Sequence, residues 1–192
     1  MKHKQCVIGL AIALGISGAE SVGATDLSYN IVEAGVLVRG YRGPVRDQGL
    51  RVRGSFEVAN NVLVTGEAAS LGGNGLWLSG GDYSFFSVGA GYVVRLSPML
   101  DIVTTASIGR VAYDTVFNSY SDWGFTLASG VRGQFAPQLE GFGRLAIDNY
   151  GDTTIYLEGG ALYQINKQWS IGGEVQLGDD HRSLTAIGRY TF

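Results

Sequence analysis

The chain has 192 residues, enough for one β domain of ordinary size. It carries 14 basic and 17 acidic residues, which excludes the basic footprint expected of a nucleic-acid-binding protein. Thirty glycines against three prolines, together with ten tyrosines, are not the composition of a helical protein.

The first 24 residues have the pattern of a secretory signal peptide. A positively charged start is followed by an uninterrupted run of apolar residues and glycines at 7–16, and small residues then lead to Ala24. The apolar run is too short to cross a bilayer as a helix. We therefore expect cleavage near Ala24 and a mature domain at 25–192. The only cysteine, Cys6, lies in the removed segment, so no intramolecular disulfide is expected.

From residue 28 onward, apolar side chains recur at every second position, which is the period of a β-strand. The alternation predicts ten strands, at residues 28–39, 49–58, 62–71, 84–95, 100–113, 123–135, 139–148, 153–164, 169–178 and 181–192. The first connections alternate between long and short, as they do in membrane barrels. The long ones are expected at 40–48, 72–83 and 114–122. An eight-stranded barrel is the alternative, if two segments merge or one lies outside the barrel.

The last strand has one apolar face that ends on an aromatic ring. That face comprises Leu184, Ala186, Gly188, Tyr190 and Phe192. An unpaired backbone group in lipid costs roughly several kcal/mol, so a sheet in a membrane must close on itself. The last strand is therefore expected to pair with the first, around residues 32–38.

The charged residues of the strands are expected on the face opposite the apolar set, because a cation on the lipid face costs roughly 2–4 kcal/mol at the bilayer midplane. They are predicted to form an ion-pair network in the lumen: Glu33, Arg51, Arg53, Glu57, Glu67, Arg95, Arg110, Arg132, Glu140, Arg144, Glu158, Glu174 and Arg189. Arginine pairs with carboxylates bidentately, which suits an enclosed space. Near-equal numbers of the two signs favour mutual pairing and a plugged or nearly closed lumen.

A soluble β-sandwich is the competing fold, because it shows the same alternation with the apolar face inside. Outward aromatic residues near the strand ends favour the membrane barrel, since they are typical of the girdle at a membrane interface. They are Trp123, Phe135, Tyr163, Trp169, Tyr190 and Phe192.

The signal peptide, the alternating strands lined with Arg and Glu, and the terminal Tyr190-x-Phe192 resemble the small outer-membrane barrel proteins of Gram-negative bacteria, the OmpA/OmpX-like group. The resemblance covers residues 25–192 and is one of pattern. It implies an all-β, antiparallel, up-and-down transmembrane β-barrel in the bacterial outer membrane, in contact with outer-membrane lipid. It also implies that the barrel-assembly machinery recognises Tyr190 and Phe192. Ten predicted strands depart from the eight usual in that group.

Three functions remain open at this point. The first is a structural or interaction barrel whose external loops contact envelope or host surface partners. Its candidate contacts are Arg42, Arg46, Trp77, Tyr120 and Trp123. The second is a narrow porin-like channel for small solutes. The third and least favoured is a hydrolase at the rim, with His181 beside Asp179 and Asp180, because a tight turn before a strand also accounts for these residues.

No catalytic residue, cofactor or metal site is predicted, and the chain is not expected to be an enzyme. One histidine and no cysteine after residue 24 fall short of a metal-ligand set. The glycine-rich stretch 72–75 lacks the lysine and the strand-to-helix context of a phosphate-binding loop.

Overall fold

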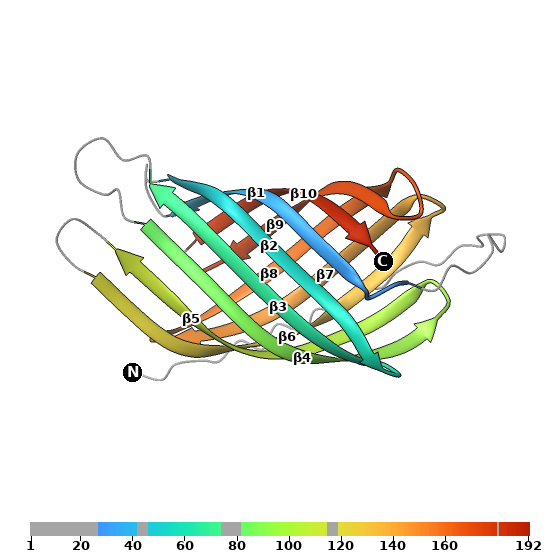
Figure 1. Cartoon of the computed structure of the whole chain (residues 1–192), viewed down its shortest axis with the longest axis horizontal. Coiled ribbons are helices and arrows are strands. Elements are labelled where there is room, and N and C mark those ends of the chain that lie inside the picture. The colour runs from blue at the N-terminus through green and yellow to red at the C-terminus, as the bar shows by residue number, and fades with distance from the viewer. Residues whose placement is uncertain (1–26, 42–45, 74–81, 115–118, 180) are drawn as a thin grey trace, which may run out of the picture.

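The computed structural model describes residues 27–41, 46–73, 82–114, 119–179 and 181–192, so the predicted signal peptide lies outside the described residues. The described residues form ten strands: β1 (Ile31–Tyr41), β2 (Arg46–Ala59), β3 (Val62–Gly73), β4 (Asp82–Ser97), β5 (Leu100–Asp114), β6 (Ser119–Ala136), β7 (Leu139–Tyr150), β8 (Asp152–Gln164), β9 (Trp169–Gly178) and β10 (His181–Thr191). Each strand pairs antiparallel with its neighbour in sequence, and β1 pairs with β10 (Figure 1). No helix in this part of the chain is long and apolar enough to cross a membrane.

The up-and-down barrel of ten strands is confirmed, and the eight-stranded alternative is wrong. Several strands extend beyond their predicted bounds because their ladders continue into the expected loops. The pairing of β1 with β2, for example, reaches Gly40 opposite Arg46, which leaves residues 42–45 of the predicted loop 40–48 between them. In the same way, residues 74–81 lie between β3 and β4, and 115–118 lie between β5 and β6.

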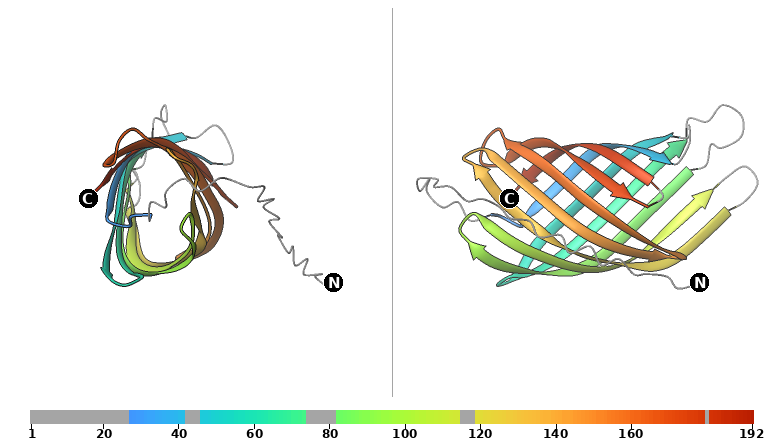
Figure 2. Two further views of the ribbon diagram at one scale, coloured as in Figure 1. Left: turned by 90° about the vertical axis from the view of Figure 1, so that its right-hand side faces the viewer. Right: turned by 180° about the vertical axis from the view of Figure 1, so that it is seen from behind.

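The barrel has an apolar outer surface, and most charged residues of its strands point inside. Viewed along its axis, the strands form a closed oval ring (Figure 2, left). Outward side chains such as Leu50, Ile108 and Leu184 are at least 60% exposed, whereas the inward Glu33 and Glu158 are buried. A soluble sandwich would place the apolar faces inside, so that alternative is wrong for the described residues.

The predicted pairing of the last strand with the first is confirmed, and the seam between β1 and β10 places Val32 opposite Tyr190 and Val38 opposite Leu184. The backbone N–H of Phe192 donates to the carbonyl oxygen of Asn30 at 3.0 Å and extends the ladder by one bond. We call the end of the barrel that holds the start of β1 and the end of β10 the terminal end, and the opposite end the loop end. The outward rings of Trp169, Tyr190 and Phe192 form a chain of edge-on contacts at the terminal end.

Strand β5 presents the face opposite to the one expected. Val103, Thr105 and Val111 point into the barrel, whereas Ile108 and Arg110 point outward. The predicted position of Arg110 in the lumen is therefore wrong. Both faces of β5 carry small and apolar residues, so alternation alone does not distinguish inside from outside here.

The first strand begins later than predicted, at Ile31 and not at residue 28. The residues before it leave the wall and pack inside the terminal end, where Leu27 and Tyr29 contact Leu63, Val93 and Val103 on β3, β4 and β5. The segment joined to β1 thus crosses the lumen to the opposite wall.

Candidate functional site

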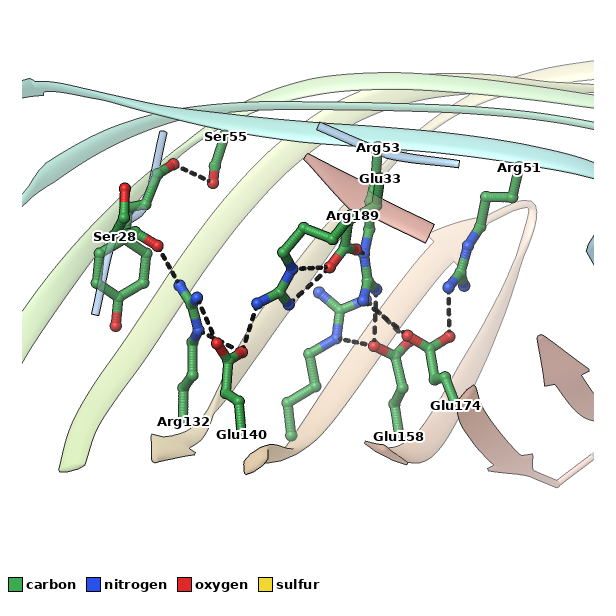
Figure 3. Close-up of polar contacts among 12 residues, drawn as sticks. Ser28, Glu33, Arg51, Arg53, Ser55, Arg132, Glu140, Glu158, Glu174 and Arg189 are labelled. Carbon is green, nitrogen blue, oxygen red and sulfur yellow. Dashed lines mark hydrogen bonds and ion pairs between the residues drawn. The ribbon is translucent and has the colours of Figure 1, made fainter. Parts of the chain in front are cut away.

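Nine of the predicted lumen residues form one connected set of ion pairs, which we call the lumen network (Figure 3). The network comprises Glu33 on β1, Arg51 and Arg53 on β2, Arg132 on β6, Glu140 and Arg144 on β7, Glu158 on β8, Glu174 on β9 and Arg189 on β10. Of the described residues of β3, β4 and β5, none contributes to it. The network therefore occupies one part of the inner circumference.

Arg53 is the centre of the lumen network, because it pairs with three carboxylates. Its Nε donates to Glu33 on the adjacent strand. Its Nη1 lies 3.0 Å from Glu158 Oε1, and its Nη2 lies 2.8 Å from Glu174 Oε2. Glu174 also accepts from Arg51 Nη2 at 2.5 Å. Since β1 and β10 separate β2 from β9, these contacts span the inside of the barrel and do not follow a single strand pair.

A second branch of the lumen network crosses the seam. Glu33 lies directly opposite both Arg53 and Arg189 in the two ladders of β1. Arg189 Nη2 is 2.6 Å from Glu33 Oε1, and its Nη1 is 2.5 Å from Glu140 Oε1. Glu140 in turn receives a bidentate pair from Arg132, at 2.8 and 2.9 Å. The ion pairs therefore connect the first and last strands to β6 and β7.

Burial makes these contacts structurally important. The side chains of Glu33, Glu158 and Glu174 are at most 3% exposed. A buried charge is tolerated when it is paired and hydrogen-bonded, and removal of one partner leaves the other uncompensated. The nine residues comprise five arginines and four glutamates, so most of their charge is mutually neutralised.

The other four predicted members lie elsewhere. Arg95 pairs with Glu57 at 3.3 Å near the terminal end, where their side chains are 46% and 24% exposed. Glu67 faces the lumen from β3, and the ion pairs of the described residues do not include it. Arg110 lies on the outer surface.

Tyr29 lies inside the terminal end of the lumen, where residues of several strands contact it. Its hydroxyl donates to Asp101 Oδ2 on β5 at 2.7 Å, and the Arg132 guanidinium lies 4.7 Å from its ring centre. The Ser55 hydroxyl donates to the Tyr29 carbonyl oxygen at 2.6 Å. Burial, assisted by the hydrogen bond to Asp101, raises the pKa of the Tyr29 hydroxyl, so it remains a donor.

A cavity of about 610 Å³ lies beside the lumen network. Its lining extends from Tyr29 and Ile31 at the terminal end to Tyr120 and His181 at the loop end. On the side away from the network, the inner faces of β3, β4 and β5 carry a group of small, uncharged residues beside Glu67 and several aliphatic and aromatic side chains. We call the small, uncharged group the neutral wall: Thr65, Ala69, Ser87, Thr105 and Ser107.

The residues predicted as loop contacts do not form one group among the described residues. Arg42 and Trp77 lie outside the described residues, and Arg46 begins β2. Tyr120 is half exposed at the loop end, and its hydroxyl donates to Asp122. Trp123 points outward from β6.

Of the residues suggested for the rim hydrolase, Asp179 and His181 lie among the described residues. His181 begins β10 and lines the cavity. Asp179 is exposed, and Asp180 lies outside the described residues.

The sequence matches no protein-family model and no curated protein sequence. Among solved structures, the KdgM porin is similar, with 15% identity over 83% of this chain and 99% of that chain and a TM-score of 0.47. Neisserial surface protein A is similar, with 12% identity over 84% and 95% of the two chains and a TM-score of 0.47. Ail of Yersinia pestis has 16% identity over 83% and 95%, with a TM-score of 0.41. These similarities concern barrel architecture alone.

Sequence reasoning missed Tyr29 and its partner Asp101. A signal was present, because Tyr29 has the same parity as Glu33 and so belongs to the inner face. The large ring of Tyr29, just before the charged inner face of the first strand, could have indicated a side chain that fills part of the lumen.

Proposed function

We propose that this chain is a closed structural barrel of the bacterial outer membrane, exported with its signal peptide, whose surface loops contact envelope or host partners. The observation that carries the proposal is the lumen network, which joins seven strands by ion pairs across the interior. In this arrangement the terminal end faces the periplasm and the loop end faces outward.

The outer surface supports a membrane location. Apolar side chains point outward along every strand, and large ones such as Leu50, Ile108 and Leu184 are mostly exposed. A continuous apolar surface of this extent is unfavourable in water and favourable in hydrocarbon. The closed ladder also pairs the backbone groups of both edge strands, which lipid requires.

Two features oppose the passage of solutes. The lumen network fixes charged side chains in mutual pairs, and Tyr29 fills the terminal end against β3, β4 and β5. An ion entering this space would meet the charges of the lumen network, which are already paired with one another. The interior is therefore suited to holding the strands together, and partner contacts are left to the surface.

Membrane fractionation and planar-bilayer recording test the proposal together. We expect the mature protein in the outer-membrane fraction, with heat-modifiable migration on a gel after detergent extraction. In a planar bilayer, the inserted protein should leave the membrane current unchanged. A protein found in the soluble periplasmic fraction would refute the membrane location, and discrete current steps would refute the closed lumen.

A narrow channel is the second candidate, and the cavity beside the lumen network favours it. The cavity extends from Tyr29 to the loop end, so displacement of residues 27–30 would open a path along the neutral wall. Under this alternative, Tyr29→Ala alone would produce a steady conductance. Under the closed-barrel proposal, the ion pairs above Tyr29 still obstruct the lumen, and the single variant stays silent.

The barrel-assembly machinery is the proposed partner of the last strand. The outward side chain of Phe192 is 66% exposed, and its ring contacts Tyr190 at a centroid distance of 5.2 Å. Deletion of Phe192 should reduce the amount of folded barrel in the outer membrane more than any alteration of the loops does. The heat-modifiable band measures this amount, with Phe135→Ala as a control for loss of another outward ring. Normal insertion of the truncated chain would contradict the assignment.

A further inference from the structure

Arg110 is a cation on the outer surface of the barrel. Strand β5 places it on the same face as Ile108, which is 61% exposed. In the adjoining ladders it lies directly opposite Phe86 on β4 and Trp123 on β6, both of which point outward. The guanidinium therefore faces the surroundings of the barrel and not its lumen.

The neighbours of Arg110 form a defined surface, which we call the external arginine site: Arg110, Ser121, Phe86 and Trp123. The two rings meet edge-on, with their centres 5.6 Å apart and their planes at 87°. Arg110 Nη2 donates to the Ser121 hydroxyl at 3.0 Å, which holds the guanidinium beside the rings. Val88 and Ile108 lie opposite each other one row toward the terminal end and continue the apolar surface.

The external arginine site lies near the loop end. Arg110 is four residues from Asp114, the last residue of β5, which corresponds to about 13 Å along a strand. A long cationic side chain at this depth can place its apolar stem on the barrel and its head at the polar boundary. The site thus combines a cation at the boundary with an apolar surface below it.

The charge of Arg110 has no carboxylate partner among the ion pairs of the described residues. The outward acids Asp82 and Asp114 face each other at the rim, beyond the level of Arg110. Within the described part of the barrel, its guanidinium donates to a neutral hydroxyl, that of Ser121. An arginine fork in this position matches the geometry of a phosphate.

We propose that the external arginine site binds the phosphate of a lipid in the outward-facing leaflet, with an acyl chain of that lipid on Val88 and Ile108. The inference rests on the proposed membrane location. The phosphate accepts from the guanidinium, and the Phe86 and Trp123 rings flank the headgroup boundary. An anionic lipid is favoured over a zwitterionic one, because an ammonium group on the headgroup competes for the same phosphate.

Trp123 provides a local probe, and Trp169 provides a matched control. Both are outward rings of the girdles, but Trp169 lies at the terminal end, paired with Tyr190 and without an arginine opposite it. One variant, Trp77→Phe with Trp169→Phe, leaves Trp123 as the reporter. A second, Trp77→Phe with Trp123→Phe, leaves Trp169. Each is reconstituted in phosphatidylcholine with a minor fraction of brominated-chain lipid, which quenches indole fluorescence on contact.

We expect brominated phosphatidylglycerol to quench Trp123 more strongly than brominated phosphatidylcholine, with an apparent enrichment of about fivefold at low salt. Arg110→Gln should abolish this preference, whereas Arg95→Gln, which removes a cation elsewhere, should preserve it. Trp169 should show no preference. Equal quenching of Trp123 by the two lipids, or a preference that survives Arg110→Gln, would overturn the proposal.

Two further measurements show why a given variant lacks the lipid preference. Millimolar inorganic phosphate should leave the lipid preference intact, and loss of the preference would assign the site to free phosphate instead. Heat-modifiable migration of each variant reports insertion. A chain that inserts without lipid preference overturns the lipid site alone. A chain that does not insert overturns both the membrane location and the site.

Discussion

The two sides of the lumen differ in how they are built. One side, formed by β1, β2 and β6 to β10, carries nine charged residues in mutual ion pairs. The neutral wall on β3, β4 and β5 carries small and hydroxylated residues and borders the cavity. Charge pairing therefore stabilises the part of the barrel that contains the seam, whereas the neutral wall depends on backbone pairing and close approach of its strands.

The largest loss of stability is expected when Arg53, the centre of the lumen network, is replaced. Arg53→Met would leave Glu33, Glu158 and Glu174 short of a partner in a buried environment, and removing one member of a buried pair costs about 3–5 kcal/mol. Urea unfolding in detergent micelles or lipid vesicles measures this loss. Arg95→Met, which breaks a partly exposed pair with Glu57, is the control and should cost less than about 1 kcal/mol. Equal destabilisation by the two variants would contradict the special role of the network.

The next effect concerns the backbone of β4 and β5, beside the neutral wall. A methyl group added to the inward Gly109 would overlap the Phe86 carbonyl oxygen on β4, so Gly109→Ala should cost about 1–3 kcal/mol through a forced backbone shift. Gly66→Ala is the matched control on β3, because the atom nearest to its added methyl is the Ser87 carbonyl oxygen at 3.8 Å. The same unfolding assay compares them. A neutral result for Gly109→Ala would show that the two strands can separate freely.

The smallest change in the free energy of unfolding is expected where an enlarged side chain can enter the cavity. Thr105 lines the cavity on β5, so Thr105→Met should change the free energy of unfolding by less than about 1.5 kcal/mol. Thr185, on β10 among the charged residues, is 1% exposed, and Thr185→Met should cost more because no space receives the larger side chain. If Thr105→Met lowered the free energy of unfolding more than Thr185→Met, the cavity would not lie beside Thr105.

Much of the architecture could be predicted because each strand repeats the same signal. Strands such as β6 and β10 alternate large apolar residues with charged or small ones, and their inner and outer faces agree with that pattern. Arg110 could not be placed, because β5 has Val103 and Val111 on one face and Ile108 on the other. In that strand, pairing with β4 and β6 decides which face is outside.

The partners within the lumen could not be read from the chain. Arg53 and Glu158 are 105 positions apart on strands that are not adjacent, so their contact depends on the shape of the closed barrel. The alternation in the sequence predicts a first strand at 28–39, which includes Tyr29. Its position in the lumen depends on contacts with Asp101 and Arg132. These two residues lie on β5 and β6 and come close to Tyr29 only in the closed barrel.

Conductance in a planar bilayer tests most directly whether the ion pairs and Tyr29 together close the lumen. Wild-type protein, inserted as judged by its heat-modifiable band, should give no current steps. The double variant Tyr29→Ala with Arg53→Met should give discrete steps, because it removes the terminal plug and the centre of the network. Discrete steps from the wild-type protein would contradict the account.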